Sequence, residues 1–441
     1  MTTIAHVSQA MQTTLTTAAE AADVALQYTK RPDRAKFTAS TLVQTLVFGW
    51  LAHPDASVEQ LAQSAARVGV EVSPQAIDPR FTLATAQLLR EVLLTSVQQL
   101  IAADPVDIPI LERFTEVRVH DSTTIVLPDS LADRWEGCGG STATALKCGL
   151  QIDLLHGAWT GFDLADGRSS DQRLPLHHAA WPKGALRLAD LGFFNLGVLA
   201  DGDAAGAYWL SKLDALTVIS DATHHEVSLL RFIAALDHSA AWDEWVRLGK
   251  GRRVRARLLV QPVPQEVADQ RRRRIRKEAR KKGHTPSAVV LALAAWTILI
   301  TNAPPELLSL VEALVVAKVR WQIELIFKLW KSHGLVDQWR SGKPARIMCE
   351  VYGKLLAMLI QQWVCIVGCW AYPDRSLVKA AQVVRDHAPD LASARACIAQ
   401  LTEVLQAVQR VLKRTARINP RNKHPNTYQL LLALTTEAKE A

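Results

Sequence analysis

The segment from Arg320 to Lys331 constrains the fold most, because it combines helical spacing with an apolar surface on most sides. At about 100° per residue, the charged residues fall within a sector of roughly 80° around the helix, and they are Arg320, Glu324, Lys328 and Lys331. A helix that is apolar around the rest of its circumference is expected inside a sizeable domain. Its charged stripe then faces a cleft, where a carboxylate among cations suits a metal ion and a phosphate backbone. The alternative is a solvated face with ion pairs at helical spacing.

Two upstream segments favour the cleft. Val117 to Asp121 is typical of a strand with Asp121 at its end, and Leu186 to Asp190 is typical of a short buried strand that delivers Asp190 to a turn. Two strand-end aspartates and one helical glutamate supply the oxygen ligands that hard divalent cations take. The three carboxylates repel one another, so a bound cation relieves the repulsion. Either aspartate taken alone is more often a turn or cap residue.

These residues resemble those of the DDE transposases of bacterial insertion sequences, in the group named after insertion sequence 4. The resemblance rests on five segments between about residues 115 and 345, which are His120 to Thr124, Ala189 to Phe194, Gly206 to Lys212, Trp296 to Asn302 and the helix Arg320-x3-Glu324-x6-Lys331. The family pattern on that helix is Tyr-x2-Arg-x3-Glu-x6-Lys. This chain carries Ala317 at the tyrosine position, so a hydroxyl expected near the DNA backbone is missing.

The resemblance implies an α/β fold, with a ribonuclease-H-like catalytic core that is interrupted by a mostly β inserted domain and flanked by helical N- and C-terminal regions. The expected domains are a helical region at 1–112, with DNA-end binding as its candidate role, a core at 113–206 and 305–372, an inserted β-rich domain with a basic segment at 207–304, and a helical region at 373–441. The inserted domain accounts for the long interval between Asp190 and Glu324, which is far more than one crossover needs.

The resemblance also implies the chemistry. Asp121, Asp190 and Glu324 are expected to be catalytic and to hold two Mg²⁺ or Mn²⁺ ions, with Asp121 binding both ions. Two such ions can activate water and stabilise the leaving oxygen of a phosphodiester. Arg320 and Lys331 would grip phosphates beside the scissile bond, and Lys328 is a further candidate for the same contact.

Two features of the expected inserted domain point to DNA, each with a structural alternative. Trp296 could stack on a base turned out of the helix, or it could be a core residue on a strand. Nine of the twelve residues from Arg271 to Lys282 are cationic, and they include Arg272 and Arg273. This basic run could be a solvated charged helix, or it could clamp the DNA backbone. The absence of a nearby acidic run favours the clamp.

The implied function is DNA transposition by cut and paste. The enzyme would act as a metal-dependent endonuclease at terminal inverted repeats, would cut the second strand through a DNA hairpin, and would transfer the ends to target DNA as a homodimer on the DNA. A catalytically silent DNA-binding protein derived from a transposase is the alternative, and Ala317 is its support. A helical protein without a DNA role would leave the acidic trio and the basic run unexplained.

Composition agrees with a soluble DNA-binding protein of about two to four folding units. The chain has 441 residues, is 49% hydrophobic, and carries a net charge of +8 that favours an anionic partner. None of the six cysteines has zinc-site spacing, and reduced thiols in a cytosolic protein are expected. The resemblance implies the bacterial cytoplasm, at the nucleoid. The apolar stretch Leu355 to Tyr372 contains Gln361 and Gln362, and we expect a packing helix there rather than a membrane span.

Local patterns predict further elements. Helices are expected at 37–52, at 84–103, at 378–387 and at 392–411, and another begins near a cap at Asp55 or Ser57. The segment 57–81 is either a helix-turn-helix unit or a plain helical hairpin. Strands are expected at 117–121, 123–128, 146–156, 158–164, 208–212, 216–220, 253–260 and 295–301.

Overall fold

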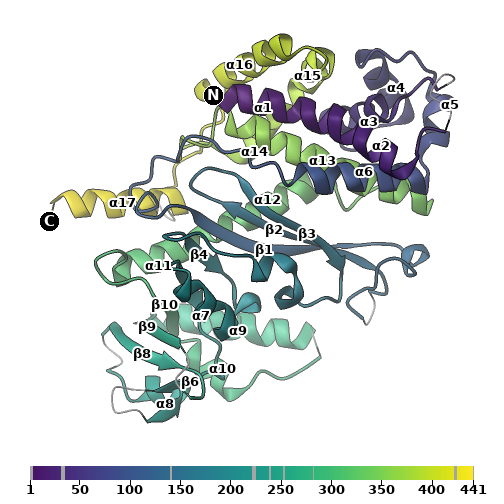
Figure 1. Cartoon of the computed structure of the whole chain (residues 1–441). Coiled ribbons are helices and arrows are strands. Elements are labelled where there is room, and N and C mark those ends of the chain that lie inside the picture. The colour runs from purple at the N-terminus through teal and green to yellow at the C-terminus, as the bar shows by residue number, and fades with distance from the viewer. Residues whose placement is uncertain are drawn as a thin grey trace. The chain divides into compact units, whose positions relative to one another are not determined.

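The structure is a computed structural model that describes residues 3–30, 35–139, 142–220, 225–237, 240–251, 254–281, 283–421 and 425–440. It is a mixed α/β structure (Figure 1). The chain divides into two compact units. The first unit contains Met1–Ile108, Asp121–Ser170 and Trp321–Gln429. The second contains Pro109–His120, Asp171–Arg320 and Leu430–Ala441. Each unit is therefore built from segments that are far apart in the sequence.

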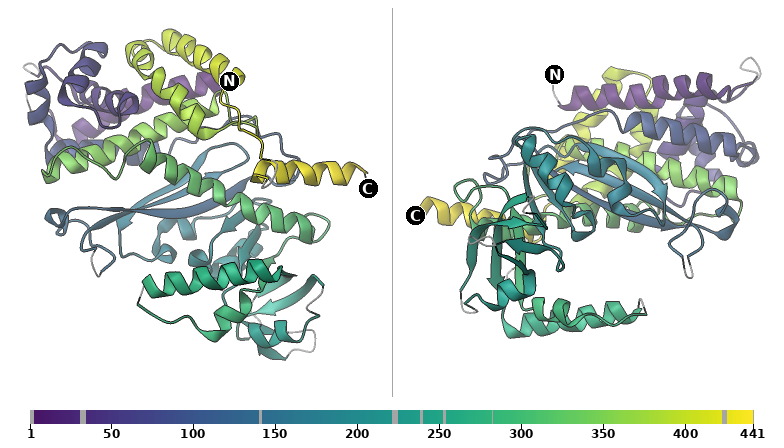
Figure 2. Two further views of the ribbon diagram at one scale, coloured as in Figure 1. Left: turned by 180° about the vertical axis from the view of Figure 1, so that it is seen from behind. Right: turned by 60° about the horizontal axis from the view of Figure 1, so that its bottom comes forward.

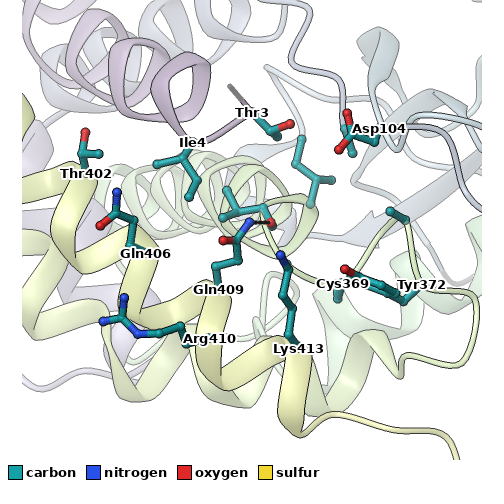
Figure 3. A pocket seen from close by; sticks show the side chains of 15 residues that line it. Thr3, Ile4, Asp104, Cys369, Tyr372, Thr402, Gln406, Gln409, Arg410 and Lys413 are labelled. Atoms are coloured by element: carbon teal, nitrogen blue, oxygen red, sulfur yellow. Dashed lines mark hydrogen bonds between the residues drawn. The ribbon is translucent and has the colours of Figure 1, made fainter. Parts of the chain in front are cut away.

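Helices dominate the first unit. They are α1 (Thr3–Gln12), α2 (Ala19–Leu26), α3 (Ala39–Ala52), α4 (Val58–Arg67), α5 (Pro74–Ile77), α6 (Leu83–Ser96), α12 (Trp321–Ser332), α13 (Pro344–Ile366), α14 (Leu377–Asp386), α15 (Ala388–Ala394) and α16 (Ile398–Arg414). A last helix, α17, spans Thr427–Glu440. Figure 2 shows α3, α6 and α14 gathered around α13. Residues of α1, α16 and the segment after α13 line a hollow (Figure 3).

Helix α13 forms the centre of this bundle. Every residue from Ile347 to Ile366 is buried, which confirms the expected packing helix. No helix of the described residues is both long and apolar enough to span a bilayer. Gly353 lies in the middle of α13, where a Cβ atom would stand 2.1 Å from a ring carbon of Trp50 on α3. The missing side chain therefore makes room for the indole, which is 1% exposed.

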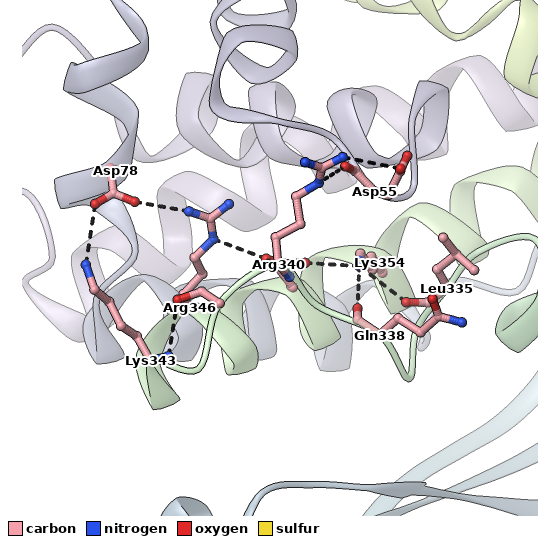
Figure 4. A network of polar contacts seen from close by, with 10 residues as sticks. Asp55, Asp78, Leu335, Gln338, Arg340, Lys343, Arg346 and Lys354 are labelled. Atoms are coloured by element: carbon pink, nitrogen blue, oxygen red, sulfur yellow. Dashed lines mark hydrogen bonds and ion pairs between the residues drawn. The ribbon is translucent and has the colours of Figure 1, made fainter.

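A polar network fastens α13 to the loop that follows α12 (Figure 4). Lys354 is 1% exposed, and its Nζ donates to the carbonyl oxygens of Gln338 at 2.6 Å and Leu335 at 3.3 Å. The same ammonium pairs with Glu350 at 3.1 Å. Because all three N–H donors of the buried ammonium have acceptors, the network can hold a charge that would otherwise be costly to bury.

The network continues to the N-terminal helices through arginine side chains. Arg346 pairs with Glu350 at 3.1 Å and with Asp78 at 3.1 Å, and its guanidinium lies 4.5 Å from the centre of the Phe81 ring. Arg340 contacts Asp55. The segment after α12 is thus tied to residues 55–81 of the N-terminal helices.

The capped helix start predicted at Ser57 is confirmed. The Ser57 hydroxyl accepts the Gln60 N–H at 3.3 Å, and the Gln60 side chain accepts the Ser57 N–H at 2.9 Å. This is a capping box, and it starts α4. Of the two alternatives for 57–81, the plain helical hairpin fits better, since α5 has only four residues and is too short for a recognition helix.

Strand β1 (Val117–Val126) is continuous, where the sequence pattern predicted two strands. Residues Asp121–Val126 belong to the first unit, together with β2 (Ala145–Asp153) and β3 (Trp159–Asp166). β2 lies between β1 and β3 and pairs antiparallel with β3. All nine residues of β2 are buried, as expected for the central strand of three.

The other residues of β1, Val117–His120, belong to the second unit and pair in parallel with β4 (Leu186–Ala189). β4 in turn pairs in parallel with β5 (Tyr208–Lys212). From β5 the order continues through antiparallel pairs as β10 (Trp296–Thr301), β9 (Val254–Pro262), β8 (Trp242–Leu248), β6 (Val218–Ser220) and β7 (Glu226–Ser228). The first strand of the expected insertion therefore pairs with the strand that delivers Asp190.

Helices and a shared core complete the second unit. The helices are α7 (Leu196–Ala204), α8 (Leu229–Ala234), α9 (Gln265–Lys281), α10 (Ala288–Leu293) and α11 (Leu310–Val319). One hydrophobic cluster joins buried side chains of β5, β6, β8, β9 and β10, including Trp209, Leu258 and Ile300. These five strands of the expected insertion thus share a core.

Candidate active site

Asp121 lies within β1, directly after His120. Its side chain is half-buried, and its Oδ1 accepts the backbone N–H of Ser122 at 2.8 Å. The sequence placed Asp121 at a strand end, but the strand runs on to Val126. The residue before it points into a core: the His120 ring lies 4.3 Å from the Phe193 ring and is fully buried. Since neighbouring side chains on a strand point to opposite faces, Asp121 is directed to the other face.

Asp190 follows β4 and begins a short 3-10 turn, as predicted. Its carboxylate is 3.2 Å from Lys212 Nζ and 3.7 Å from Arg320 Nη2. Burial alone would raise the pKa of Asp190, but these two cations and the Leu191 N–H outweigh it and lower the pKa below the ordinary value. The carboxylate is therefore ionised at neutral pH and available to a cation.

Lys212 is a site residue that the sequence analysis did not select. It is the last residue of β5, and β5 runs parallel to β4. The carboxyl ends of parallel neighbours meet at one edge of a sheet, so Lys212 and Asp190 are brought together. Lys212 could have been selected from the sequence, because it is the last residue of Gly206 to Lys212, one of the segments on which the family resemblance rests.

The helix that carries Glu324 was predicted correctly. It is α12, and it buries one side through Ile323, Ile326, Phe327, Leu329 and Trp330. The Trp330 ring packs against Trp159 at 5.3 Å, which anchors the helix on β3. Glu324 is half-buried, Lys328 is exposed, and Lys331 Nζ donates to the carbonyl oxygen of Thr124 on β1 at 2.9 Å. Lys331 thus reaches the strand that carries Asp121, three residues further along.

Arg320 lies between α11 and α12 rather than within one long helix. Its pairing with Asp190 places the first cation of the charged stripe beside one of the predicted metal ligands. Ala317, at the family's tyrosine position, lies one turn earlier on α11 and is half-buried.

The trio itself stays a prediction. Asp121 and Glu324 belong to the first unit, and Asp190 belongs to the second. Within the described ranges, no group of three or more His, Cys, Asp or Glu side chains is arranged to hold a metal ion. The donor chemistry nevertheless fits a hard divalent cation, because all three are carboxylates and Asp190 is held in its ionised form.

A buried arginine ties together the two strands that precede the aspartates. Arg187 on β4 is 4% exposed, and its guanidinium lies 2.7 Å from His120 Nε2, 2.8 Å from His177 Nδ1 and 4.5 Å from the centre of the Trp181 ring. Burial lowers the pKa of Arg187 to about 9, and burial together with this cation lowers the pKa of His177 to about 4. The histidines are therefore neutral acceptors at pH 7.

Trp296 lies on β10 with only 8% of its surface exposed, inside the hydrophobic cluster of the second unit. This position fits the core alternative. Stacking on an extruded base would require the indole to leave the cluster.

The basic run forms most of α9, and its arginines differ in their surroundings. Arg271 donates to the carbonyl oxygen of Trp296 at 2.8 Å, and Arg272 pairs with Asp269 at 2.8 Å. Arg273, Arg274, Arg276 and Lys277 are exposed, and Lys282 lies outside the described residues. The exposed members are the ones that could contact DNA.

Transposases of bacterial insertion sequences are similar to this chain in sequence. The chain is 27% identical over 358 residues to the transposase for insertion sequence element IS231B of Bacillus thuringiensis subsp. berliner, covering 76% of this chain and 74% of that protein. It is 25% identical over 343 residues to the transposase for insertion sequence element IS1151 of Clostridium perfringens, covering 71% and 72%. Among solved structures, the piggyBac transposase synaptic complex with hairpin DNA is similar at a TM-score of 0.47 and 8% identity, over 94% of this chain and 87% of that one.

A family model matches the part of the chain that contains the candidate active site. Residues 112–360 match the family model described as transposase DDE domain. This range is more than half of the 441 residues, and it includes Asp121, Asp190 and Glu324. The chain therefore belongs to the transposase DDE domain family.

Proposed function

We propose that Asp121, Asp190 and Glu324 form the active site with which this protein cleaves DNA at the terminal inverted repeats of its element and joins the ends to target DNA by transesterification. The protein is a transposase of an insertion sequence, and thus a DNA-cleaving and strand-transferring enzyme. The observation that carries the assignment is the setting of Asp190. An ionised carboxylate at the end of β4 lies beside Arg320, the first cation of the stripe that includes Glu324.

Enzymes of this family depend on divalent metal ions. We propose that Asp121, Asp190 and Glu324 would hold two ions, Mg²⁺ or Mn²⁺. Such ions supply an activated water and charge stabilisation on the leaving oxygen. The carboxylate donor set and the lowered pKa of Asp190 support the assignment, because a ligand that is already ionised needs no proton release.

The cations of the site have separate roles in this proposal. Arg320 lies 3.7 Å from Asp190, and a guanidinium can bind a phosphate through two parallel hydrogen bonds. Lys331 is held by the Thr124 carbonyl oxygen and presents a positive charge along β1. Lys212 keeps Asp190 ionised at 3.2 Å and offsets the repulsion among the acidic groups. The exposed cations of α9, including Arg273, would follow the DNA backbone.

We also infer a ribonuclease-H-like core with a mostly β insertion. The parallel pairs β1–β4 and β4–β5 and the antiparallel pair β2–β3 support the core. Pairing of β5 with β4 favours an insertion that begins after Lys212. From the family resemblance we further propose second-strand cleavage through a DNA hairpin, a homodimer on the DNA, and action in the cytoplasm at the nucleoid.

The test uses purified protein and a DNA fragment that carries both ends of the element, with Mg²⁺ or Mn²⁺. We expect the wild type to nick the repeats, and we expect Asp121→Asn, Asp190→Asn and Glu324→Gln to abolish nicking. Asp201→Asn, which changes an exposed carboxylate on α7, is the matched control and should cleave normally.

Nicking by the Asp121→Asn variant at the wild-type rate would remove the catalytic assignment. If the wild type binds the repeats but shows no metal-dependent cleavage, the catalytically silent alternative is supported instead.

A further inference from the structure

One face of α16 carries a row of polar side chains that no proposed catalytic step uses. The row consists of Thr402, Gln406, Gln409, Arg410 and Lys413, at the spacing of one helix face. These residues line a hollow of about 620 Å³ in the first unit, whose other side includes Thr3, Asp104 and Tyr372 (Figure 3). Arg410 and Lys413 are exposed, and so are Arg414 and Arg417 beyond them.

Packing fixes this face toward the hollow. The neighbouring face of α16 is buried through Leu401, Leu405, Val408 and Leu412. At Gly368 a Cβ atom would lie 3.0 Å from the Gln409 Cα, so the helix can approach the chain closely only because this side chain is absent. Gln409 Nε2 also donates to the Val367 carbonyl oxygen at 2.8 Å, and the Thr402 and Ser8 hydroxyls are 3.0 Å apart. The polar row is thus held in one orientation.

The electrostatics of the hollow favour an anion. Arg and Lys side chains only donate hydrogen bonds, and the Gln, Thr and Tyr side chains can donate. At the end of α13, which also lines the hollow, the Cys365 carbonyl oxygen accepts the Cys369 N–H at 3.1 Å and the Val364 carbonyl oxygen accepts the Val367 N–H at 3.3 Å. These two carbonyl oxygens at the negative end of the α13 dipole therefore already accept hydrogen bonds from the chain itself, which weakens their repulsion of an anion in the hollow. Among the lining residues, Asp104 is the one carboxylate.

We propose that this face of α16 binds the phosphodiester backbone of duplex DNA, in addition to the acidic site and α9. The inference rests on the proposed function, because DNA transposition supplies the ligand. An extended anion fits better than a single phosphate group. The row from Thr402 to Lys413 rises about 16 Å along the helix axis, which spans several phosphates at about 3.4 Å per strand.

The decisive experiment measures binding of short linear duplex DNA of random sequence, without divalent metal, over a series of salt concentrations. The test variant is the full-length Arg410→Gln/Lys413→Gln protein. Loss of two phosphate contacts should lower the slope of log binding constant against log salt by about 1.8 in magnitude. The control Arg231→Gln/Lys250→Gln removes the same charge from two other exposed positions and should leave the slope as in the wild type.

A second variant predicts the opposite sign. Asp104→Asn removes the acidic group that faces the same hollow, so it should tighten DNA binding if phosphates enter there. A merely structural role for the hollow predicts no such gain. Both sites are on the surface, and a thermal unfolding midpoint unchanged from the wild type would confirm that each variant is folded.

The outcomes separate the two proposals. If the wild type binds DNA and the α16 double variant keeps its full salt slope, the α16 inference fails while the catalytic assignment stands. If the wild type shows no affinity for DNA at low salt, both fail.

Discussion

Asp190 illustrates how neighbouring charges set the charge state of a single side chain. It carries two positively charged neighbours, Lys212 and Arg320, from different elements. In the absence of metal these cations offset the negative charge of the carboxylate. Since both pairs are partly exposed to solvent, they contribute little to global stability. Their main effect is on the charge state of Asp190.

Lys212→Gln should raise the pKa of Asp190, because it removes the nearer cation while the burial that opposes ionisation remains. The folded-state pKa is depressed, so the ion pair stabilises the fold above about pH 4 and this stabilisation is lost as the pH falls through the folded-state pKa. The measurement is a carboxyl NMR titration of both proteins. Lys250→Gln, at an exposed turn, should not move the Asp190 titration. An unchanged or lower pKa in Lys212→Gln would contradict this account.

The sequence predicted the positions of Asp190 and Glu324 in their elements, because each depends on a local pattern. It could not decide the surroundings of Trp296 or find Lys212 beside Asp190. Those depend on which strands become neighbours, and the parallel pair β4–β5 joins segments separated by a helix. The metal trio remains a prediction for the same reason.

At the scale of elements, short-range patterns succeeded where one face is apolar. The predicted strand at 208–212 coincides with β5, and the one at 295–301 begins one residue before β10. β8 was missed because it contains Asp243, Glu244 and Arg247. Asp243 lies on this strand as the partner of Arg257 on β9, a guanidinium with 1% of its side chain exposed. The strand thus tolerates a charged residue because its partner lies on the neighbouring strand, and the local sequence pattern does not reveal that partner.

The C-terminal helices show the same limit. The pattern at 392–411 predicted one helix, and the structure has α15 and α16 with a break between them. Arg395 lies at this break, and its side chain contacts Gln44 on α3 and the Val68 carbonyl oxygen after α4. The break therefore serves contacts with the N-terminal helices, which no local pattern encodes.

Lys354→Met should destabilise the protein by about 3 kcal/mol, the lower end of the cost of breaking a buried ion pair, because Glu350 keeps its pair with Arg346. Glu350 would lose its nearest ammonium, and the Leu335 and Gln338 carbonyl oxygens would lose a donor. The free energy of unfolding in urea measures the effect. Lys318→Met, on an exposed position of α11, should stay within about 0.5 kcal/mol of the wild type.

A double variant, Glu350→Leu/Lys354→Met, tests the cause. It removes both charges and should recover part of the loss. If the free energy of unfolding of the double variant is lower than that of Lys354→Met, the ion pair is not the source of the effect.

For the whole molecule, the net charge of +8 says only that an anionic partner is favoured. The structure distributes that charge unevenly, with exposed groups along α9 in the second unit and at the end of α16 in the first. The division of the chain into units could not be predicted from composition, because each unit collects segments distant in the sequence.

The cations of α9 should separate into two classes. Arg273→Gln/Arg276→Gln removes exposed charges and should lower the salt slope of DNA binding by about 1.8 with little effect on stability. Arg272→Gln breaks contacts with Asp269 and the Leu291 carbonyl oxygen, so it should cost about 1 kcal/mol of stability. Salt-titrated binding and urea unfolding of both variants give the comparison. Equal effects of the two variants on binding would argue against a backbone clamp.

The fit of Trp50 against Gly353 has a consequence for how this protein can change over generations. Any side chain at position 353 collides with the indole, and a smaller residue at position 50 leaves a void beside the glycine. Each single replacement is therefore penalised, whereas a paired exchange of bulk between the two helices can be tolerated. Substitutions on α3 and α13 at this contact are therefore expected to occur together. A chimera that takes one of these helices from a relative would also need the other helix from the same relative.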